Sequence, residues 1–317
     1  MFPCKVGSAW EVFAPAKLNL YLDVMGCRPD GFHELETLMV PVRIYDSLRW
    51  IQKPSPGLTL RIQNLLPPGS FANEGFATDE MAPRESVLVD ADAKADNLVL
   101  RAGQLLAQSA GIQPCGTFEL VKRIPIQAGM GGGSSDAAAT LRLANAAWGI
   151  GYSTRQLVSL AAELGSDVPF FLQSSSAICR GRGELIESVT GLPHLHFVIL
   201  KPAIGLSTAE VFSRFKGERR FGAKQETLPK LITLLRRGDI AQASSLMHNA
   251  LESVAAEMTP WIERLRKSFA NCGCYTQLMT GSGSAFLGVM RSAAQAKSAA
   301  HLLASRGLGT VLTTSSL

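Results

Sequence analysis

The chain has 317 residues, of which 46% are apolar and 18% are charged, values typical of a globular protein that buries most of its length. A single hydrophobic core rarely serves more than about 250 to 300 residues, so we expect two domains that share a cleft. The net charge of +5 comes from scattered basic residues. This distribution argues against a nucleic-acid surface and is typical of solvated helix faces.

The sequence shows no signal for export, for membrane insertion or for disulfide bonding. The first 30 residues lack a charged segment followed by an apolar one, and no run of about 18 apolar residues occurs. The six cysteines lack the spacing of a disulfide framework, and Cys272 and Cys274 lack partners at zinc-site spacing. We therefore expect a cytoplasmic protein with reduced thiols, no membrane partner and no metal held by its own side chains.

The first third of the chain is predicted to be mainly β. Residues 10–25 alternate apolar and polar side chains, which predicts a strand broken at Pro15. A turn at 28–31 leads to a second strand at 32–44. Residues 64–95 are acidic, contain prolines and offer little to bury, so we expect a surface loop or insertion there.

Helices and strands alternate after this insertion. The expected elements are a helix at 98–108, a strand at 117–124, a helix at 137–148 and strands at 168–172 and 197–200. Ser153 and Gln156 have the spacing of a capping box, so another helix should begin there and end at Gly165. The second half is richer in helix. We place a domain boundary near residue 180, between an N-terminal domain at 1–180 and a C-terminal domain at 181–317.

A glycine-rich segment connects the strand at 117–124 to the helix at 137–148. Residues 129–135 read Gly-Met-Gly-Gly-Gly-Ser-Ser. Small residues let backbone amides approach phosphate oxygens at the positive end of a helix, so residues 125–135 are predicted to bind a nucleotide phosphate. A flexible loop or a packing turn is the alternative. Asp136 would repel a triphosphate, so its carboxylate either points away or has Mg²⁺ beside it.

Two familiar phosphate-binding loops do not fit this segment. A Walker loop requires lysine after its last glycine, whereas Ser134 follows Gly133 and no lysine occurs between Lys122 and Lys201. A dinucleotide-binding fold would need a third glycine at Ser134 and an acidic residue about twenty positions later. Residues 150–162 contain no Asp or Glu. A nicotinamide dehydrogenase is therefore a distant alternative.

Three segments resemble, in order, the motifs of the GHMP kinase superfamily. They are Ala-Pro-Ala-Lys-Leu-Asn-Leu at 14–20, the segment at 125–138, and Met-Thr-Gly-Ser-Gly-Ser-Ala-Phe at 279–286. The segments at 28–38 and 164–170 make the chain most similar to those members that phosphorylate an alcohol linked to cytidine diphosphate. The resemblance covers most of the chain.

This resemblance fails across the insertion at 64–95 and is loose over residues 215–271. It implies an α+β, two-domain GHMP kinase fold, with an N-terminal domain like ribosomal protein S5 domain 2 and a ferredoxin-like C-terminal domain. ATP, with Mg²⁺, and the substrate would meet in the cleft between them. The implied reaction is transfer of the ATP γ-phosphate to the 2-hydroxyl of 4-(cytidine 5'-diphospho)-2-C-methyl-D-erythritol in non-mevalonate isoprenoid synthesis.

The resemblance also assigns two catalytic residues. Asp167 is the expected base, and Lys17 would contact both this carboxylate and the substrate hydroxyl. Without the resemblance, an Asp before Val-Pro would be interpreted as a turn or capping residue, and a lysine in an apolar strand as one that reaches the surface. Phosphoryl transfer needs an aligned hydroxyl, a proton acceptor and neutralised phosphate oxygens, and this pair can serve those needs.

The nucleotide-binding role falls on one continuous segment. Its residues are Pro125, Ile126, Gln127, Ala128, Gly129, Met130, Gly131, Gly132, Gly133, Ser134 and Ser135. Either serine hydroxyl could lie near Mg²⁺. Residues 281–284 would form a second wall of small side chains near the phosphates. Some relatives carry extra glycines where this chain has Gln127 and Ala128, a mild change that should leave the loop functional.

Substrate binding is implied for Asn19, Phe32, His33, Thr208 and Phe212, and Asp30 is a lesser candidate. The two phenylalanines would stack on the cytosine and His33 would bond to its edge, although Phe32 stands where the family often has tyrosine. Outside this context, core packing and an exposed turn histidine would be the preferred interpretations. Arg180 and Arg182 could reach a diphosphate, but a solvated turn is preferred for them.

Two other functions compete with this one. A related kinase could share the ATP loop and act on homoserine, mevalonate or its phosphate, but Phe32, His33 and the Gly-Ser-Asp at 165–167 argue against it. A catalytically silent nucleotide-binding homologue would not need both Lys17 and Asp167. We expect a monomer or a homodimer.

Overall fold

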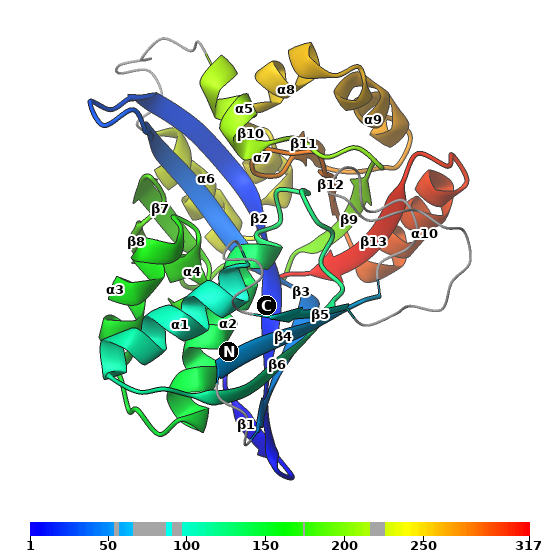
Figure 1. Ribbon diagram of the computed structural model, residues 1–317. Coiled ribbons are helices and arrows are strands. Elements are labelled where there is room, and N and C mark those ends of the chain that lie inside the picture. The colour runs from blue at the N-terminus through cyan, green and yellow to red at the C-terminus, as the bar shows by residue number, and fades with distance from the viewer. Residues whose placement is uncertain (54–56, 66–86, 91–96, 174, 216–225) are drawn as a thin grey trace.

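The computed structural model describes the chain except for residues 54–56, 66–86, 91–96, 174 and 216–225, and contains two sheets with their helices (Figure 1). The first part consists of β1 (Cys4–Val6), β2 (Ala9–Cys27), β3 (His33–Gln52), β4 (Gly57–Asn64), β5 (Val87–Asp90), α1 (Leu98–Ala110), β6 (Cys115–Lys122), α2 (Gly132–Ala147), α3 (Thr154–Leu164), α4 (Val168–Gln173), β7 (Ala177–Gly181) and β8 (Leu185–Ser188). The second part consists of β9 (His196–Lys201), α5 (Thr208–Arg214), α6 (Thr227–Arg236), α7 (Ile240–Ser244), β10 (His248–Asn249), α8 (Glu252–Met258), α9 (Trp261–Phe269), β11 (Thr276–Met279), β12 (Phe286–Met290), α10 (Ala293–Ala304) and β13 (Thr310–Ser315).

The first sheet is built on two long antiparallel strands, β2 and β3, which cross the molecule in Figure 1. Its strand order is β1-β2-β3-β6-β4-β5; off this path, β7 pairs with β3, β8 pairs with β7, and β10 pairs with β2. The break expected at Pro15 is only an irregularity of register between Pro15 and Ala16, because a bulge accommodates a proline without ending the strand. Strand β2 is therefore one element that carries the whole 14–20 motif.

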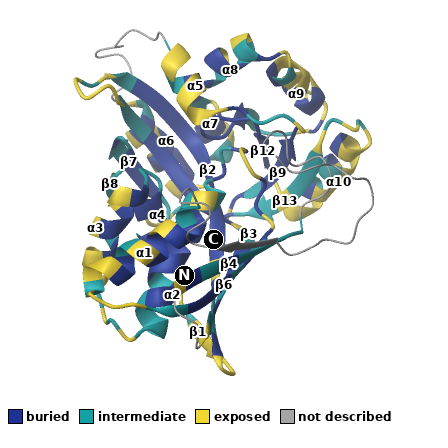
Figure 2. Cartoon of the chain, in the orientation of Figure 1, coloured by how far each residue is buried: buried dark blue, intermediate teal, exposed yellow. Residues whose placement is uncertain are grey.

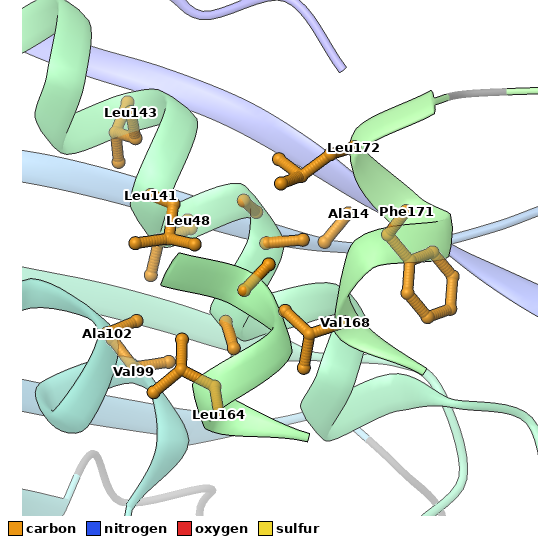
Figure 3. Close-up of a cluster of buried hydrophobic side chains, with 14 of the residues drawn as sticks. Ala14, Leu48, Val99, Ala102, Leu141, Leu143, Leu164, Val168, Phe171 and Leu172 are labelled. Atoms are coloured by element: carbon orange, nitrogen blue, oxygen red, sulfur yellow. The ribbon is translucent and has the colours of Figure 1, made fainter. Parts of the chain in front are cut away.

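Helices α1 to α4 cover one face of this sheet, and their apolar side chains gather in one buried cluster (Figure 3). The cluster includes Ala14, Leu48, Val99, Ala102, Leu141, Leu143, Leu164, Val168, Phe171 and Leu172. Many members of α2 are alanines with no exposed surface. These small side chains let α2 approach the sheet closely, which fixes the position of its N-terminus.

Two expected elements differ in the structure. The strand predicted at 168–172 is wrong, because these residues form helix α4. A short buried apolar run does not distinguish a strand from a helix, and Pro169 is well tolerated in the first turn of a helix. The helix expected from Ala137 begins earlier, at Gly132, inside the glycine-rich segment. The capping box of Ser153 and Gln156 is confirmed at the start of α3.

The second sheet has four antiparallel strands in the order β11-β12-β9-β13. Alternate residues of β9 enter different cores, because successive strand side chains point to opposite faces. Phe197 and Ile199 pack with β2 and β3, whereas Val198 and Leu200 pack with the C-terminal helices. Both faces of the sheet are thus covered, as the buried colouring of β9 in Figure 2 shows. This strand order is the expected ferredoxin-like arrangement.

The two parts of the chain are interlocked. The boundary expected near residue 180 falls inside β7, which pairs with β3 and β8, and the change of sheet lies between Ser188 and His196. Strand β10 from the second part pairs in parallel with β2. Most of the insertion expected at 64–95 lies outside the described residues, and β5 within it pairs with β4. None of the described helices has the length and apolar character needed to cross a membrane.

Candidate active site

A cleft of 1340 Å³ opens between the long strands of the first sheet, the N-terminus of α2 and loops of the second part. All the residues predicted to be catalytic, nucleotide-binding or substrate-binding line it, with the exception of Ser135 and of the lesser candidate Asp30. Residues 281 and 282 of the second glycine segment line it as well. The fold thus brings distant segments of the chain together. The backbone N–H of Asn19 donates to Thr280 Oγ1 at 3.1 Å, although the two residues are 261 positions apart.

The glycine-rich loop presents backbone at the start of α2. Gly131, at the N-cap, has a φ of 71°, and no side chain caps the helix. The first-turn amides therefore remain available to an anion in the cleft. Gly129 has a φ of 72°, and a Cβ there would lie 2.0 Å from the carbonyl oxygen of Thr280. Only glycine fits at that position.

The second glycine segment lies directly against this loop. The backbone N–H of Ser284 donates to Gln127 O at 3.3 Å, and that of Ala285 donates to Ala128 O at 3.4 Å. The hydroxyl of Thr280 donates to Gly129 O at 3.3 Å. The two small-residue segments thus form one continuous wall, in which β11 and β12 hold the loop from the side of the second sheet.

The two adjacent serines differ in what their hydroxyls reach. Ser135 is fully buried, and its hydroxyl donates to Pro15 O at 2.7 Å while its N–H donates to Gly131 O. The structure therefore directs Ser135 away from the cleft, where it ties α2 to β2. Of the two serines, only Ser134 is among the residues that line the cleft.

A buried ion-pair network lies beneath the loop, and sequence reasoning missed it. The ammonium of Lys122, at the end of β6, contacts Asp46 of β3 and lies 2.5 Å from Asp136 of α2. Asp46 also accepts the backbone N–H groups of Arg123 and Ile124. Both ends of the glycine-rich loop are thus fixed to the same charged cluster.

This network explains the carboxylate that the sequence places in the first turns of α2. Asp136 does not point at the phosphate site as a free charge, because its Oδ2 pairs with Lys122. Burial raises the pKa of Asp136 to about 7, although the Lys122 ammonium opposes that shift and the nearby Asp46 adds to it. The other oxygen, Oδ1, has no hydrogen-bond partner among the described residues.

Lys17 and Asp167 meet in the middle of the cleft. Lys17 Nζ lies 3.5 Å from Asp167 Oδ2, and it donates to Asn19 Oδ1 at 2.5 Å. Lys17 and Asn19 point to the same face of β2 because they are two residues apart. Thr37 accepts from Asn19 Nδ2 at 2.8 Å and so fixes the amide. The backbone N–H of Lys17 donates to Met130 O, which ties the pair to the phosphate loop.

The other predicted substrate-binding residues also line the cleft, and two of their rings lie close together. The rings of His33 and Phe212 have centroids 5.3 Å apart, and Thr208 Oγ1 lies 2.7 Å from Ser282 Oγ. Phe32 is 48% exposed, so it offers its ring to a ligand. Asp30 lies in the preceding turn, where it accepts the backbone N–H of Phe32 and pairs with Arg28.

Comparisons with known proteins agree with this architecture. Residues 97–175 match the model of the GHMP kinases N terminal domain, and residues 231–307 match that of the GHMP kinases C terminal domain. A 4-diphosphocytidyl-2-C-methyl-D-erythritol kinase of Pelotomaculum thermopropionicum is 37% identical over 277 residues, which are 87% of each chain. A protein of the same name from Heliobacterium modesticaldum is 34% identical and covers 92% of this chain and 89% of its own.

Solved structures confirm the two-domain α+β fold. A crystal structure of 4-(cytidine 5'-diphospho)-2C-methyl-D-erythritol kinase superposes with a TM-score of 0.74 at 31% identity, covering 96% of this chain and 98% of its own. A mevalonate kinase of L. major shares the fold with a TM-score of 0.73 at 14% identity, and the superposition covers 99% of this chain and 96% of that kinase. The chain therefore belongs to the 4-diphosphocytidyl-2-C-methyl-D-erythritol kinase family of the GHMP kinases, which are ATP-dependent kinases of small molecules.

Proposed function

We propose that this kinase transfers the γ-phosphate of ATP to the 2-hydroxyl of 4-(cytidine 5'-diphospho)-2-C-methyl-D-erythritol, a step of non-mevalonate isoprenoid synthesis. The observation that carries the proposal is the position of the Lys17–Asp167 pair. It lies in the same cleft as an uncapped helix N-terminus, which suits ATP phosphates, and a group of aromatic rings, which suits a nucleoside base. The names of the relatives at 34 to 37% identity support the same substrate.

Asp167 and Lys17 divide the work of the transfer in this proposal. The substrate hydroxyl oxygen attacks the γ-phosphorus while the bond to the β,γ-bridging oxygen breaks, so that ADP leaves and Asp167 takes the hydroxyl proton. The Lys17 ammonium, 3.5 Å from that carboxylate, supplies positive charge beside the transferred group. Asn19 holds the ammonium in place through its side-chain oxygen. Much of the rate therefore depends on alignment.

The loop at 125–134 would hold the ATP phosphates with its backbone amides. Mg²⁺ prefers oxygen ligands and keeps several from phosphate and water. Ser134 offers the hydroxyl that fits this preference, and the described residues contain no group of three His, Cys, Asp or Glu side chains able to bind a metal without the nucleotide. When bound, Mg²⁺ would neutralise charge on the phosphate oxygens.

The opposite end would hold the cytidine. Phe32 and Phe212 offer ring faces for the base, and His33, which packs on Phe212, offers ring nitrogens to its edge. Asn19 and Thr208 would contact the methylerythritol and its phosphates from β2 and α5. A homoserine or mevalonate substrate would leave these aromatic side chains without a partner.

The test is ADP release by the purified chain with ATP and Mg²⁺, offered one alcohol at a time. The panel is the cytidine-diphosphate alcohol, homoserine, mevalonate and phosphomevalonate. We expect turnover with the first alone. Turnover of another alcohol without turnover of the first would overturn the substrate assignment. If the chain bound ATP but turned over none of these alcohols, it would be a catalytically silent nucleotide-binding homologue.

A further inference from the structure

The side chain of Asn249 holds the backbone on both sides of Thr280, where the chain enters the second glycine segment. Asn249 is 4% exposed and ends β10, the short strand that pairs in parallel with β2. Its amide nitrogen donates to Met279 O at 2.7 Å and to Gly281 O at 2.8 Å. Its amide oxygen accepts the backbone N–H of Leu251 at 3.0 Å. Both amide hydrogens and the amide oxygen are therefore used.

Glu252 holds the same backbone through a second contact. Its Oε2 accepts the backbone N–H of Met279 at 2.9 Å, and its Oε1 pairs with Arg266. Met279 is thus held at its carbonyl by Asn249 and at its N–H by Glu252. Because Met279 is the last residue of β11, these contacts fix the point where the chain leaves the second sheet and enters the cleft.

The backbone held in this way lies against the groups proposed to carry the transfer. Gly281 has a φ of 56°, and a Cβ there would be 2.8 Å from Gly129 O and 3.2 Å from Lys17 Nζ. Thr280, between the two held carbonyls, donates to Gly129 O at 3.3 Å and to Asn19 Oδ1 at 3.4 Å. The same Asn19 oxygen accepts from the Lys17 ammonium. The position of this backbone therefore limits where the ammonium can lie.

We propose that Asn249 is a positioning residue for phosphoryl transfer, which acts through Gly281 on the ammonium of Lys17. This inference rests on the proposed function. Asn249 is not among the residues that line the cleft, so its effect passes through the backbone that it holds. Without its two donated hydrogen bonds, the carbonyls of Met279 and Gly281 would need other partners, and the backbone beside Lys17 would shift. A misplacement of about 1 Å can cost about 100-fold in rate.

The experiment compares Asn249→Asp with Asn145→Asp by steady-state and single-turnover kinetics, with ATP, Mg²⁺ and the cytidine-diphosphate alcohol. Asn249→Asp keeps the shape of the side chain and the acceptor for Leu251, but it offers at most one hydrogen to the two carbonyls. Asn145 is the matched control, because its amide also bonds to backbone, at Tyr152 N and O, and it does not line the cleft.

The expected result is a loss of rate without a loss of substrate affinity. In Asn249→Asp, kcat should fall about 10- to 100-fold while KM for ATP and KM for the alcohol stay within about threefold of the parent values. In Asn145→Asp, kcat should stay unchanged. Single-turnover rates should show the same difference, which places the loss in the transfer step and not in product release.

Three results would contradict the inference: an unchanged kcat in Asn249→Asp, a rise in KM at unchanged kcat, or an equal fall of kcat in Asn145→Asp. Thermal unfolding shows which variants are folded at the assay temperature. If Asn249→Asp is not, Asn249→Ser, which keeps one donor, is compared with Asn145→Ser by the same criteria. A parent chain that phosphorylates only another alcohol would contradict the proposed substrate instead, and the kinetic comparison is then made with that alcohol.

Discussion

The two ends of the cleft are built in different ways. At the proposed ATP end the surface is mostly backbone, held by glycine contacts and by the buried cluster of Asp46, Lys122 and Asp136. At the proposed substrate end the surface consists of side chains, including Phe32, which is 48% exposed. The difference teaches that a substitution beneath the ATP end should act mainly through stability, whereas one at the substrate end should act mainly through substrate affinity.

The largest effect is expected where the two ends meet. Asp167→Asn keeps the shape of the side chain but removes the proposed proton acceptor, so we expect turnover to fall by about 10²- to 10⁴-fold. ATP binding should persist, because the loop amides do not depend on this carboxylate. Steady-state kinetics and ATP calorimetry measure the two effects. Turnover close to that of the parent chain would remove Asp167 from its proposed role.

The next effect tests the buried cluster at the ATP end. Lys122→Met leaves the carboxylates of Asp46 and Asp136 buried without their counter-ion, and breaking such a network typically costs about 3 to 5 kcal/mol of stability. Urea unfolding measures the loss, and Lys230→Met, at an exposed position of α6, is the control. A loss as small as that of the control would show that the cluster does not hold the loop.

A smaller effect is expected from the exposed ring at the substrate end. Phe32→Ala removes a stacking surface worth about 1 to 3 kcal/mol per base, so KM for the cytidine substrate should rise while stability and KM for ATP change little. Phe32→Tyr keeps the ring and should behave like the parent chain. A rise in KM for ATP instead would place Phe32 outside the substrate end.

The last effect is a dependence of stability on pH at the proposed ATP end. Folding raises the pKa of Asp136 from 3.8 to about 7, chiefly through burial, so the folded chain binds more protons than the unfolded chain in that window. The free energy of unfolding should therefore fall as the pH rises from about 4 to about 7, by at most about 1.4 kcal/mol per pH unit for this group. Asp136→Asn should lack this contribution. Urea unfolding of both chains across the window compares the slopes, and identical slopes would contradict the prediction.

Local patterns predicted the elements that carry a regular signal. The capping box of α3, the end of α1 at Gly111 and the strand that precedes the phosphate loop all follow from short-range chemistry. The error at 168–172 arose because five buried apolar residues carry no usable period. The boundary near residue 180 was placed where the chain becomes richer in helix, a pattern that does not show that β7 pairs with β3 and β8.

The motifs in the sequence predicted the residues of the candidate site. They did not predict the buried hydrogen bonds and ion pairs that hold those residues in place. The sequence shows a carboxylate, Asp136, at the start of a helix next to the predicted phosphate site, but not which cation neutralises it. The available signal for that cation was Lys122, a lysine at the end of an apolar strand. The ion pairs of Lys122 with Asp136 and Asp46 still could not be predicted from the sequence, because the three residues come from three separate elements, β6, α2 and β3. The same holds for Ser135, whose hydroxyl turns inward.

The sequence by itself determined the chemistry that the chain can offer: a glycine loop before a helix, a lysine in the strand at 10–25 and an aspartate before Val-Pro. Tertiary structure decided which of these groups face one another and which charges are already neutralised. The physical reason is that hydrogen bonds and ion pairs act over a few ångströms. Residues distant in sequence acquire such contacts only when strand pairing and helix packing bring them into a common cleft.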